Sequence, residues 1–291
     1  MTLTAEQLDG WLSIPPHELA AHARIPFTLV DTPEDVHRTF AATQFAEFAD
    51  ARAAGERIAV IVPVGPTGHF AHLARMVNEA RLELDHVTFF AMDEWLDWEG
   101  RPLPDAHPLR LEGIFQRDLL GRIDAELRPR DADVIFPSPF ALDRCAEEIE
   151  RRGGVSTCYA GVGFQGHLAF NEPPATRWSP VTVQQLARSR TRVLPIAVDT
   201  AIAHAQRSAG GNVFAVPPMG ITLGMRELLG AKRLRMYIDT GAWKQTMLRI
   251  LLFSEPDVAY PATLASLHPD AEVVADLVTA TVPERAIVGD G

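Results

Sequence analysis

Residues 161–173 read GVGFQGHLAFNEP, and this stretch decides how the rest of the chain is interpreted. Residues 158–162 have the apolar character of a buried strand, and a glycine-rich turn follows them. Glycine lets a backbone turn tightly or approach a ligand closely. The turn leads to His167 and then to Glu172, which we expect to orient the ring of a general acid–base histidine. Because the glycines lead to a histidine and not to a long helix, the pattern does not indicate a dinucleotide site.

The composition is that of an ordinary globular protein of 291 residues, 47% hydrophobic and 22% charged. A chain of this length can bury a large core without disulfides. Cys145 and Cys158 therefore fit buried thiols in a reducing compartment, and we expect a cytoplasmic protein. The formal net charge of −11 argues against a nucleic-acid partner. The sequence has no apolar run long enough for a membrane span and no secretory leader pattern.

Short apolar runs alternate with amphipathic segments, as expected for parallel strands covered on both faces. The expected strands are 27–30, 57–63, 87–91, 133–136, 157–162, 193–196, 219–223, 234–238 and 272–275. The expected helices are 33–54, 69–82, 108–121, 140–152, 198–208, 224–230, 241–253 and 261–267. This order predicts an α/β fold with a doubly wound, mostly parallel, Rossmann-like sheet in an α/β/α sandwich. We expect residues 1–26 to form an N-terminal extension and residues 27–291 a single catalytic domain.

Ligands of such sheets bind at the carboxyl ends of the strands. We expect the loops at 64–69, 92–96, 163–172 and 217–219 to begin at such ends, so that one edge of the sheet holds a single site. Residues 173–191 are rich in proline and arginine, which indicates a loop or lid over that site.

Three of these segments resemble the glucosamine-6-phosphate deaminase family. The strand–turn motif of that family reads GVGxDGHIAFNEP, and residues 161–173 fit it except at Gln165, where the family has Asp, and at Leu168. Residues 89–95, FFAMDEW, resemble the family's FNMDEY, and residues 64–68, VGPTG, resemble its sugar-phosphate loop.

The likeness extends from about residue 27 to 276 and implies an enzyme that opens a sugar ring and moves a proton between C2 and C1. Ammonia would leave if the substrate is a 2-amino sugar. Asp93, beside Glu94, would be the base, and burial should raise the pKa of such a carboxyl. Apart from the resemblance, the acidic pair could equally begin a helix. His167, with Gln165 and Glu172 near it, would pass a proton to or from the ring oxygen.

The resemblance also implies that a sugar or sugar phosphate is the partner, and a homo-oligomer is possible. The substrate-binding residues that it implies are Gly65, Pro66, Thr67, Gly68, His69, Gly163, Gly166, Arg192 and Pro218. His69 occupies a family glycine position and either contacts the ligand or fills space. Because neither metal-ligand spacing nor a serine nucleophile motif is present, we expect no metal and no organic cofactor.

Two departures from the family pattern bear on the substrate. Gln165 keeps hydrogen bonding but cannot ionise, which should lower the pKa of His167. Pro218 and Gln206 stand where the family has a lysine and an arginine, and each lost charged hydrogen bond costs roughly 1.5–3 kcal/mol. We therefore expect an altered substrate without the phosphate. The alternative is that another cation binds the phosphate, supplied by Arg177, Arg188, Arg190 or Arg207.

Two other functions stay open. The first is a lactonase, since 6-phosphogluconolactonases share the fold and a related GxGxDGH turn, although the continuation AFNEP resembles the deaminase branch. The second is a sugar-binding regulator without turnover. The presence of Asp93, His167 and Glu172 together argues against a pure binding protein, which needs no base.

Overall fold

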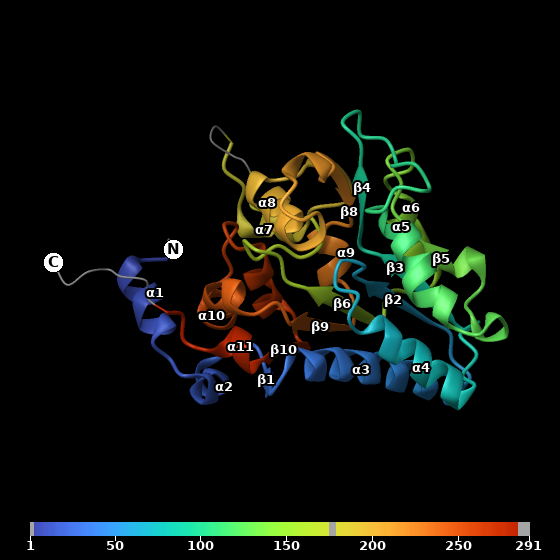
Figure 1. The fold of residues 1–291 in the computed structure, drawn as a ribbon, viewed down its shortest axis with the longest axis horizontal. Coiled ribbons are helices and arrows are strands. Elements are labelled where there is room, and N and C mark those ends of the chain that lie inside the picture. The colour runs from blue at the N-terminus through green and yellow to red at the C-terminus, as the bar shows by residue number, and fades with distance from the viewer. Residues whose placement is uncertain (1–2, 175–178, 285–291) are drawn as a thin grey trace.

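The computed structural model describes residues 3–174 and 179–284, so Arg177 lies outside the described residues. A seven-stranded parallel sheet forms its centre in the order β1-β10-β9-β6-β2-β3-β5 (Figure 1). Its strands are β1 (Phe27–Val30), β2 (Ile58–Val62), β3 (Val87–Ala91), β5 (Val134–Ile135), β6 (Thr157–Gly161), β9 (Arg233–Ile238) and β10 (Ala271–Asp276). The predicted α/β class is confirmed.

A second sheet has three antiparallel strands, β4 (Asp93–Leu96), β8 (Met219–Thr222) and β7 (Arg192–Pro195). The prediction of a loop at 92–96 was therefore wrong, because Asp93 pairs with Thr222 in a strand. For the same reason the acidic pair does not begin a helix. The loop at 217–219 precedes β8 and does not follow a strand, so it does not share the carboxyl edge of the main sheet.

Helices cover the main sheet, and the expected ends are met within a few residues for most of them. The longer helices are α1 (Ala5–Leu12), α3 (Pro33–Ala54), α4 (Phe70–Ala80), α6 (Arg144–Arg151), α8 (Val198–Ser208) and α10 (Gln245–Phe253). Shorter ones are α2 (Leu19–His22), α5 (Leu111–Ile114), α7 (Val183–Ala187), α9 (Met225–Leu229) and α11 (Leu277–Ala280). A π-helix at Phe115–Leu119 continues α5.

Single 3₁₀ turns join many of these elements. They lie at Pro16–Glu18, Leu120–Arg122, Ala125–Leu127, Asp131–Asp133, Val213–Ala215 and Ala242–Lys244. The segment Pro261–Leu267, expected as an α-helix, is a longer 3₁₀-helix.

Helix α3 shows how local sequence sets these boundaries. The Thr32 hydroxyl accepts a hydrogen bond from the Asp35 amide, and the Asp35 carboxylate accepts one from the Thr32 amide, which forms a capping box. Pro33 occupies the first helical position, and Gly55 ends the helix with φ 70°. Helices α3 and α4 lie side by side along the sheet (Figure 1).

Two hydrophobic cores lie on the two faces of the sheet, because successive side chains of a strand point to opposite faces. On β2, Ala59 and Ile61 belong to one core, whereas Val60 and Val62 belong to the other. The nearly continuous apolar runs in the sequence reflect this burial on both faces. Both cysteines are buried free thiols within this packing.

The N-terminal residues pack onto the body of the protein. Trp11 of α1 contacts Phe253 of α10, with ring centroids 6.0 Å apart. The guanidinium of Arg249, also on α10, donates hydrogen bonds to the carbonyl oxygens of Trp11 and Ile14. The domain boundary placed after residue 26 stays a prediction. None of the helices in the described part of the chain is long and apolar enough to cross a membrane.

The segment at 173–191 was expected to be a loop or lid, and part of it is helical. Helix α7 begins with a capping box between Thr182 and Gln185 and buries Leu186. Short helices form here because the cap satisfies the first amide groups locally.

Candidate functional site

A cavity of about 400 Å³ opens where strands β2, β3, β6 and β9 end. Six of the residues expected at the site line this cavity: Gly65, Pro66, Thr67, Asp93, Gly163 and His167. They come from the segments after β2, β3 and β6, which are distant in sequence; Asp93 is the first residue of β4. Parallel strands bring these segments to one edge of the sheet, as expected. Helix α8, the segment after β9 and the stretch from Pro108 to Asp118, which contributes Arg117, close the remaining sides.

Asp93 is a buried carboxyl at the wall of this cavity, with 8% of the residue exposed. Its backbone pairs with Thr222 of β8, and this pairing fixes the position of the Asp93 Cα. Burial, and then the charge of Glu94, raises the pKa of Asp93 from 3.8 to about 8. A carboxyl in this environment takes up a proton readily, which is the property that a general base needs.

Glu94 points to a different environment because successive residues of a strand face opposite sides. Its carboxylate accepts hydrogen bonds from the backbone amides of Trp95, Leu111 and Glu112 at 2.7, 2.8 and 2.8 Å. Burial nevertheless raises its pKa overall. Glu94 therefore fixes the start of α5 to β4, and it does not line the cavity.

His167 is buried, lines the cavity and has a neutral imidazole. Burial, together with the nearby Lys244 and His204, lowers the pKa of His167 to about 3. The Gly163 amide donates a 2.8 Å hydrogen bond to the His167 carbonyl, which closes the turn. A Cβ at position 163 would lie 1.8 Å from His167 Nε2, so the ring occupies space that only glycine leaves free. Its Nδ1 has no hydrogen-bond partner among the described residues.

The contacts expected around His167 are not formed by Glu172 or Gln165. The carboxylate of Glu172 accepts a 2.7 Å hydrogen bond from the Ala197 amide, and no hydrogen bond between described residues joins it to His167. The buried Asn171 is tied by its side-chain amide to other backbone carbonyls, and this directs the next residue toward the start of α8. Gln165 is exposed and does not line the cavity. The roles predicted for Glu172 and Gln165 beside His167 stay predictions, because neither side chain forms a hydrogen bond with His167 among the described residues.

The other residues that were expected to bind substrate lie outside the lining of the cavity. Arg192 donates a 2.8 Å hydrogen bond to the side chain of Asn171. His69 is buried and stacks on Phe40, with ring centroids 3.7 Å apart, and burial lowers its pKa to about 3. Pro218 is exposed beside β8. None of these residues lines the cavity, and direct contact with substrate stays a prediction for each.

Two of the expected glycines are required by close packing. A Cβ at Gly68 would lie 2.3 Å from the ring of His37. At Gly166, where φ is 70°, it would lie 2.7 Å from the side chain of Met247. Both positions are therefore explained by neighbouring side chains in the fold.

Lys244 and Arg207 together form a cationic wall of the cavity, and the sequence analysis did not identify Lys244. The buried ammonium of Lys244 donates a hydrogen bond to the Val162 carbonyl. Burial, and then the charge of Arg207, lowers the pKa of Lys244 to about 7. Both cations lie over the ring of Trp243, at 5.5 Å for Arg207 and 4.8 Å for Lys244. Asp239 also lines the cavity near these two cations, and its carboxylate pairs with His37.

Arg207 was one of the cations considered from the sequence, and it lines the cavity from α8. Arg188 and Arg190 are exposed and do not. Lys244 follows the end of β9, so the rule that ligands bind at carboxyl ends of strands could have found it.

Comparison with known proteins agrees with this fold and this cavity. No protein-family model matches the sequence. The glucosamine-6-phosphate deaminase of Aeromonas salmonicida (strain A449) is 27% identical over 221 residues, which cover 74% of this chain and 76% of that protein. Glucosamine-6-phosphate deaminase 1 of Mus musculus is 28% identical over 221 residues, 74% of this chain and 70% of that one.

Solved structures show the same fold. A monomeric glucosamine-6-phosphate deaminase superposes with a TM-score of 0.74 at 21% identity, over 88% of this chain and 99% of that one. A 6-phosphogluconolactonase from Shewanella baltica OS155 gives a TM-score of 0.57 at 17% identity, over 86% of this chain and 97% of that one. The solved structures show the α/β fold, and the sequence relatives support an enzyme of the sugar isomerase and deaminase kind. The sequence relatives confirm the resemblance to the glucosamine-6-phosphate deaminase family.

Proposed function

We propose that this chain converts a 2-amino sugar phosphate into a ketose phosphate and ammonia. The observation that carries the proposal is Asp93, a buried carboxyl with a raised pKa at the wall of a cavity that also holds a neutral His167. Proton abstraction next to a carbonyl or imine needs a desolvated base of this kind. The curated relatives named glucosamine-6-phosphate deaminase support the same type of reaction.

The reaction begins with ring opening. The neutral imidazole of His167 can accept a proton at one nitrogen and donate at the other. It can therefore take the proton of the anomeric hydroxyl and supply one to the ring oxygen, whose bond to C1 breaks. The product is the open-chain aldehyde. A histidine with its pKa near 3 is neutral and holds an extra proton weakly, so its ring must give up one proton to the ring oxygen as it takes the other.

Asp93 then acts on the open chain. Its carboxylate removes the C2 proton while the C1 carbonyl oxygen takes a proton from the ammonium group of the substrate, which gives an enol with a neutral amine at C2. Asp93 then returns its proton to C1, and this leaves a protonated imine at C2. Water adds to that imine and ammonia leaves, which gives the ketose. With a pKa of about 8, Asp93 is mainly protonated at neutral pH. The amino group of the substrate, when charged, would favour the ionised form by its proximity.

Arg207 and Lys244 support a phosphorylated substrate. The expectation of a substrate without phosphate followed from Pro218 and Gln206, which remove two cations from the family pattern. Two cations line the cavity from α8 and from the end of β9 instead. They lie beside each other with one carboxylate nearby, an arrangement that a dianion would stabilise. The substrate without phosphate remains the second candidate.

Kinetics on four compounds tests the proposal. We would compare kcat/KM for glucosamine 6-phosphate, glucosamine, glucose 6-phosphate and 6-phosphogluconolactone, and measure released ammonia. We expect the first compound to be the best substrate. Higher kcat/KM for free glucosamine would instead establish the altered substrate and would contradict the role given to the two cations.

Isotope exchange separates the remaining functions. In deuterated water, proton transfer by Asp93 should place deuterium at C1 of the product. A lactonase, the function suggested by the structural likeness to 6-phosphogluconolactonase, hydrolyses its ester without exchange at these carbons. A sugar-binding regulator would show neither exchange nor turnover. Oligomeric state and cytoplasmic location stay predictions from the sequence.

A further inference from the structure

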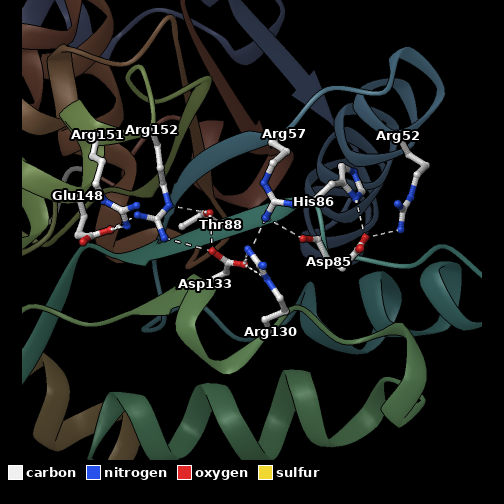
Figure 2. Close-up of polar contacts among 10 residues, drawn as sticks. All are labelled: Arg52, Arg57, Asp85, His86, Thr88, Arg130, Asp133, Glu148, Arg151 and Arg152. Carbon is white, nitrogen blue, oxygen red and sulfur yellow. Dashed lines mark hydrogen bonds and ion pairs between the residues drawn. The ribbon is translucent and has the colours of Figure 1, made fainter.

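A second cavity, of about 410 Å³, lies at the edge of the main sheet opposite the catalytic cavity. Its charged lining consists of Arg130, Arg144, Arg151, Arg152, Asp133 and Glu148. Asp133 directly precedes β5, and its neighbour Thr88 lies at the start of β3 (Figure 2). The catalytic Asp93 follows the other end of β3. The two cavities are therefore separated by the length of that strand, roughly 15 Å.

Asp133 organises this second cavity. Only 3% of its side chain is exposed, and its carboxylate contacts three guanidinium groups, those of Arg130 at 2.6 Å, Arg152 at 3.1 Å and Arg57 at 3.4 Å (Figure 2). The Thr88 hydroxyl adds a 3.3 Å contact. Burial would raise the pKa of Asp133, but the hydrogen bonds from Arg130 and Arg152 outweigh it and keep the pKa below its usual value. One carboxylate therefore holds several cations in place.

The cluster contains more positive charge than its carboxylates need. Four arginines and two carboxylates line the cavity, which leaves two positive charges in excess, although the whole chain carries −11. Arg144 is exposed and has no ion-pair or hydrogen-bond partner for its side chain among the described residues. Arg151 is 65% exposed at its side chain, and within the described part of the chain it pairs only with Glu148, which Arg152 also contacts (Figure 2). Neither Arg144 nor Arg151 is needed to neutralise Asp133.

We propose that this cavity binds a small phosphorylated anion, a phosphate ester or a diphosphate. Guanidinium groups present parallel N–H donors that match the oxygens of a phosphate, and two excess charges match a dianion. Asp133 holds Arg130 and Arg152 in fixed positions, so little side-chain freedom is lost when the anion binds. The volume is sufficient for a phosphorylated small molecule. This inference does not depend on the reaction proposed for the first cavity.

Titration with inorganic pyrophosphate tests the proposal by calorimetry on the full chain. The background carries Arg117→Gln, Arg207→Gln and Lys244→Gln, so that the catalytic cavity has lost the arginine and lysine side chains that line it and does not contribute binding heat. In this background pyrophosphate should still bind. Adding Arg144→Ala and Arg151→Ala should weaken it at least tenfold, since each substitution removes a charged hydrogen-bond donor to the anion.

Arg52→Ala is the matched control. Arg52 lies on the same face, where it pairs with Asp85 and Glu83, but it does not line the cavity (Figure 2). Its loss should change pyrophosphate affinity less than twofold. Equal weakening by Arg52→Ala would show a general charge effect and overturn the proposal, as would the absence of binding in the background protein. If the double variant fails to fold, Arg144→Ala alone, which removes no contact within the described residues, should still weaken binding by about tenfold.

Discussion

Replacing Asp93 by asparagine should abolish catalysis and stabilise the protein in a manner that depends on pH. The substitution keeps the shape of the side chain and removes the group that accepts the C2 proton. Loss of a general base costs a factor of ~10²–10⁴ in rate. It also removes a carboxyl whose pKa burial raises from 3.8 to about 8, and this second effect can be measured without substrate.

The sign of the stability change follows from proton binding. Between about pH 4 and pH 8 the folded protein keeps the Asp93 proton, whereas the unfolded chain releases it. The stability that this carboxyl contributes is therefore present below pH 4 and is lost as the pH rises through that window. The amide that replaces the carboxyl in the variant binds no proton, so the difference in unfolding free energy should grow in favour of the variant by up to about 1.4 kcal/mol per pH unit.

Urea unfolding followed by circular dichroism at pH 5, 6, 7 and 8 measures this slope. The other titrating groups are common to both proteins and cancel in the difference. Glu94→Gln is a comparison and not a control for the slope, because burial also raises the pKa of Glu94; unlike Asp93, however, Glu94 accepts three backbone hydrogen bonds. Weakening these charge-assisted bonds should destabilise the protein. Parallel curves for the wild type and Asp93→Asn would refute the reasoning, since they would mean that Asp93 has an ordinary pKa. A rate loss of only a few fold would refute its role as base.

Three further outcomes concern the same cavity. Lys244→Gln should raise KM for the phosphorylated substrate by about tenfold to a hundredfold, the equivalent of one charged hydrogen bond, and should leave kcat/KM for free glucosamine unchanged in steady-state assays. In the wild type, kcat/KM for the phosphorylated substrate should give a bell-shaped pH profile with its maximum between pH 7 and pH 8, because it rises as Asp93, with a pKa of about 8, loses its proton and falls as Lys244, with a pKa of about 7, loses its charge. A flat profile from pH 6 to 9 would contradict both assignments. Gly163→Ala should displace the His167 ring, 1.8 Å from the new Cβ, and lower the unfolding free energy by about 1–3 kcal/mol together with activity. Unchanged stability and activity of Gly163→Ala would show that the His167 ring does not lie against position 163.

The sequence by itself determined the main sheet and three of the segments that line the cavity. Runs such as 58–62 are apolar throughout because both faces of the strand are buried, a property that is visible in one segment alone. The segments around Thr67, Asp93 and His167 follow such strands directly, so their place at one edge is a consequence of parallel pairing. Helix α3 could be predicted with its correct ends because its caps are local.

Only the tertiary structure decided the second sheet and the cationic wall. Strand β4 forms because Asp93 meets Thr222, a residue far along the chain, and a four-residue strand carries too little pattern to be recognised alone. Lys244 and Arg207 meet over Trp243 because β9 and α8 converge there, although no short motif contains them. Glu172 was expected beside His167 because the two are close in sequence. The direction of a side chain depends on the backbone between them and on the packing around it, and these long-range contacts are not encoded in any single segment.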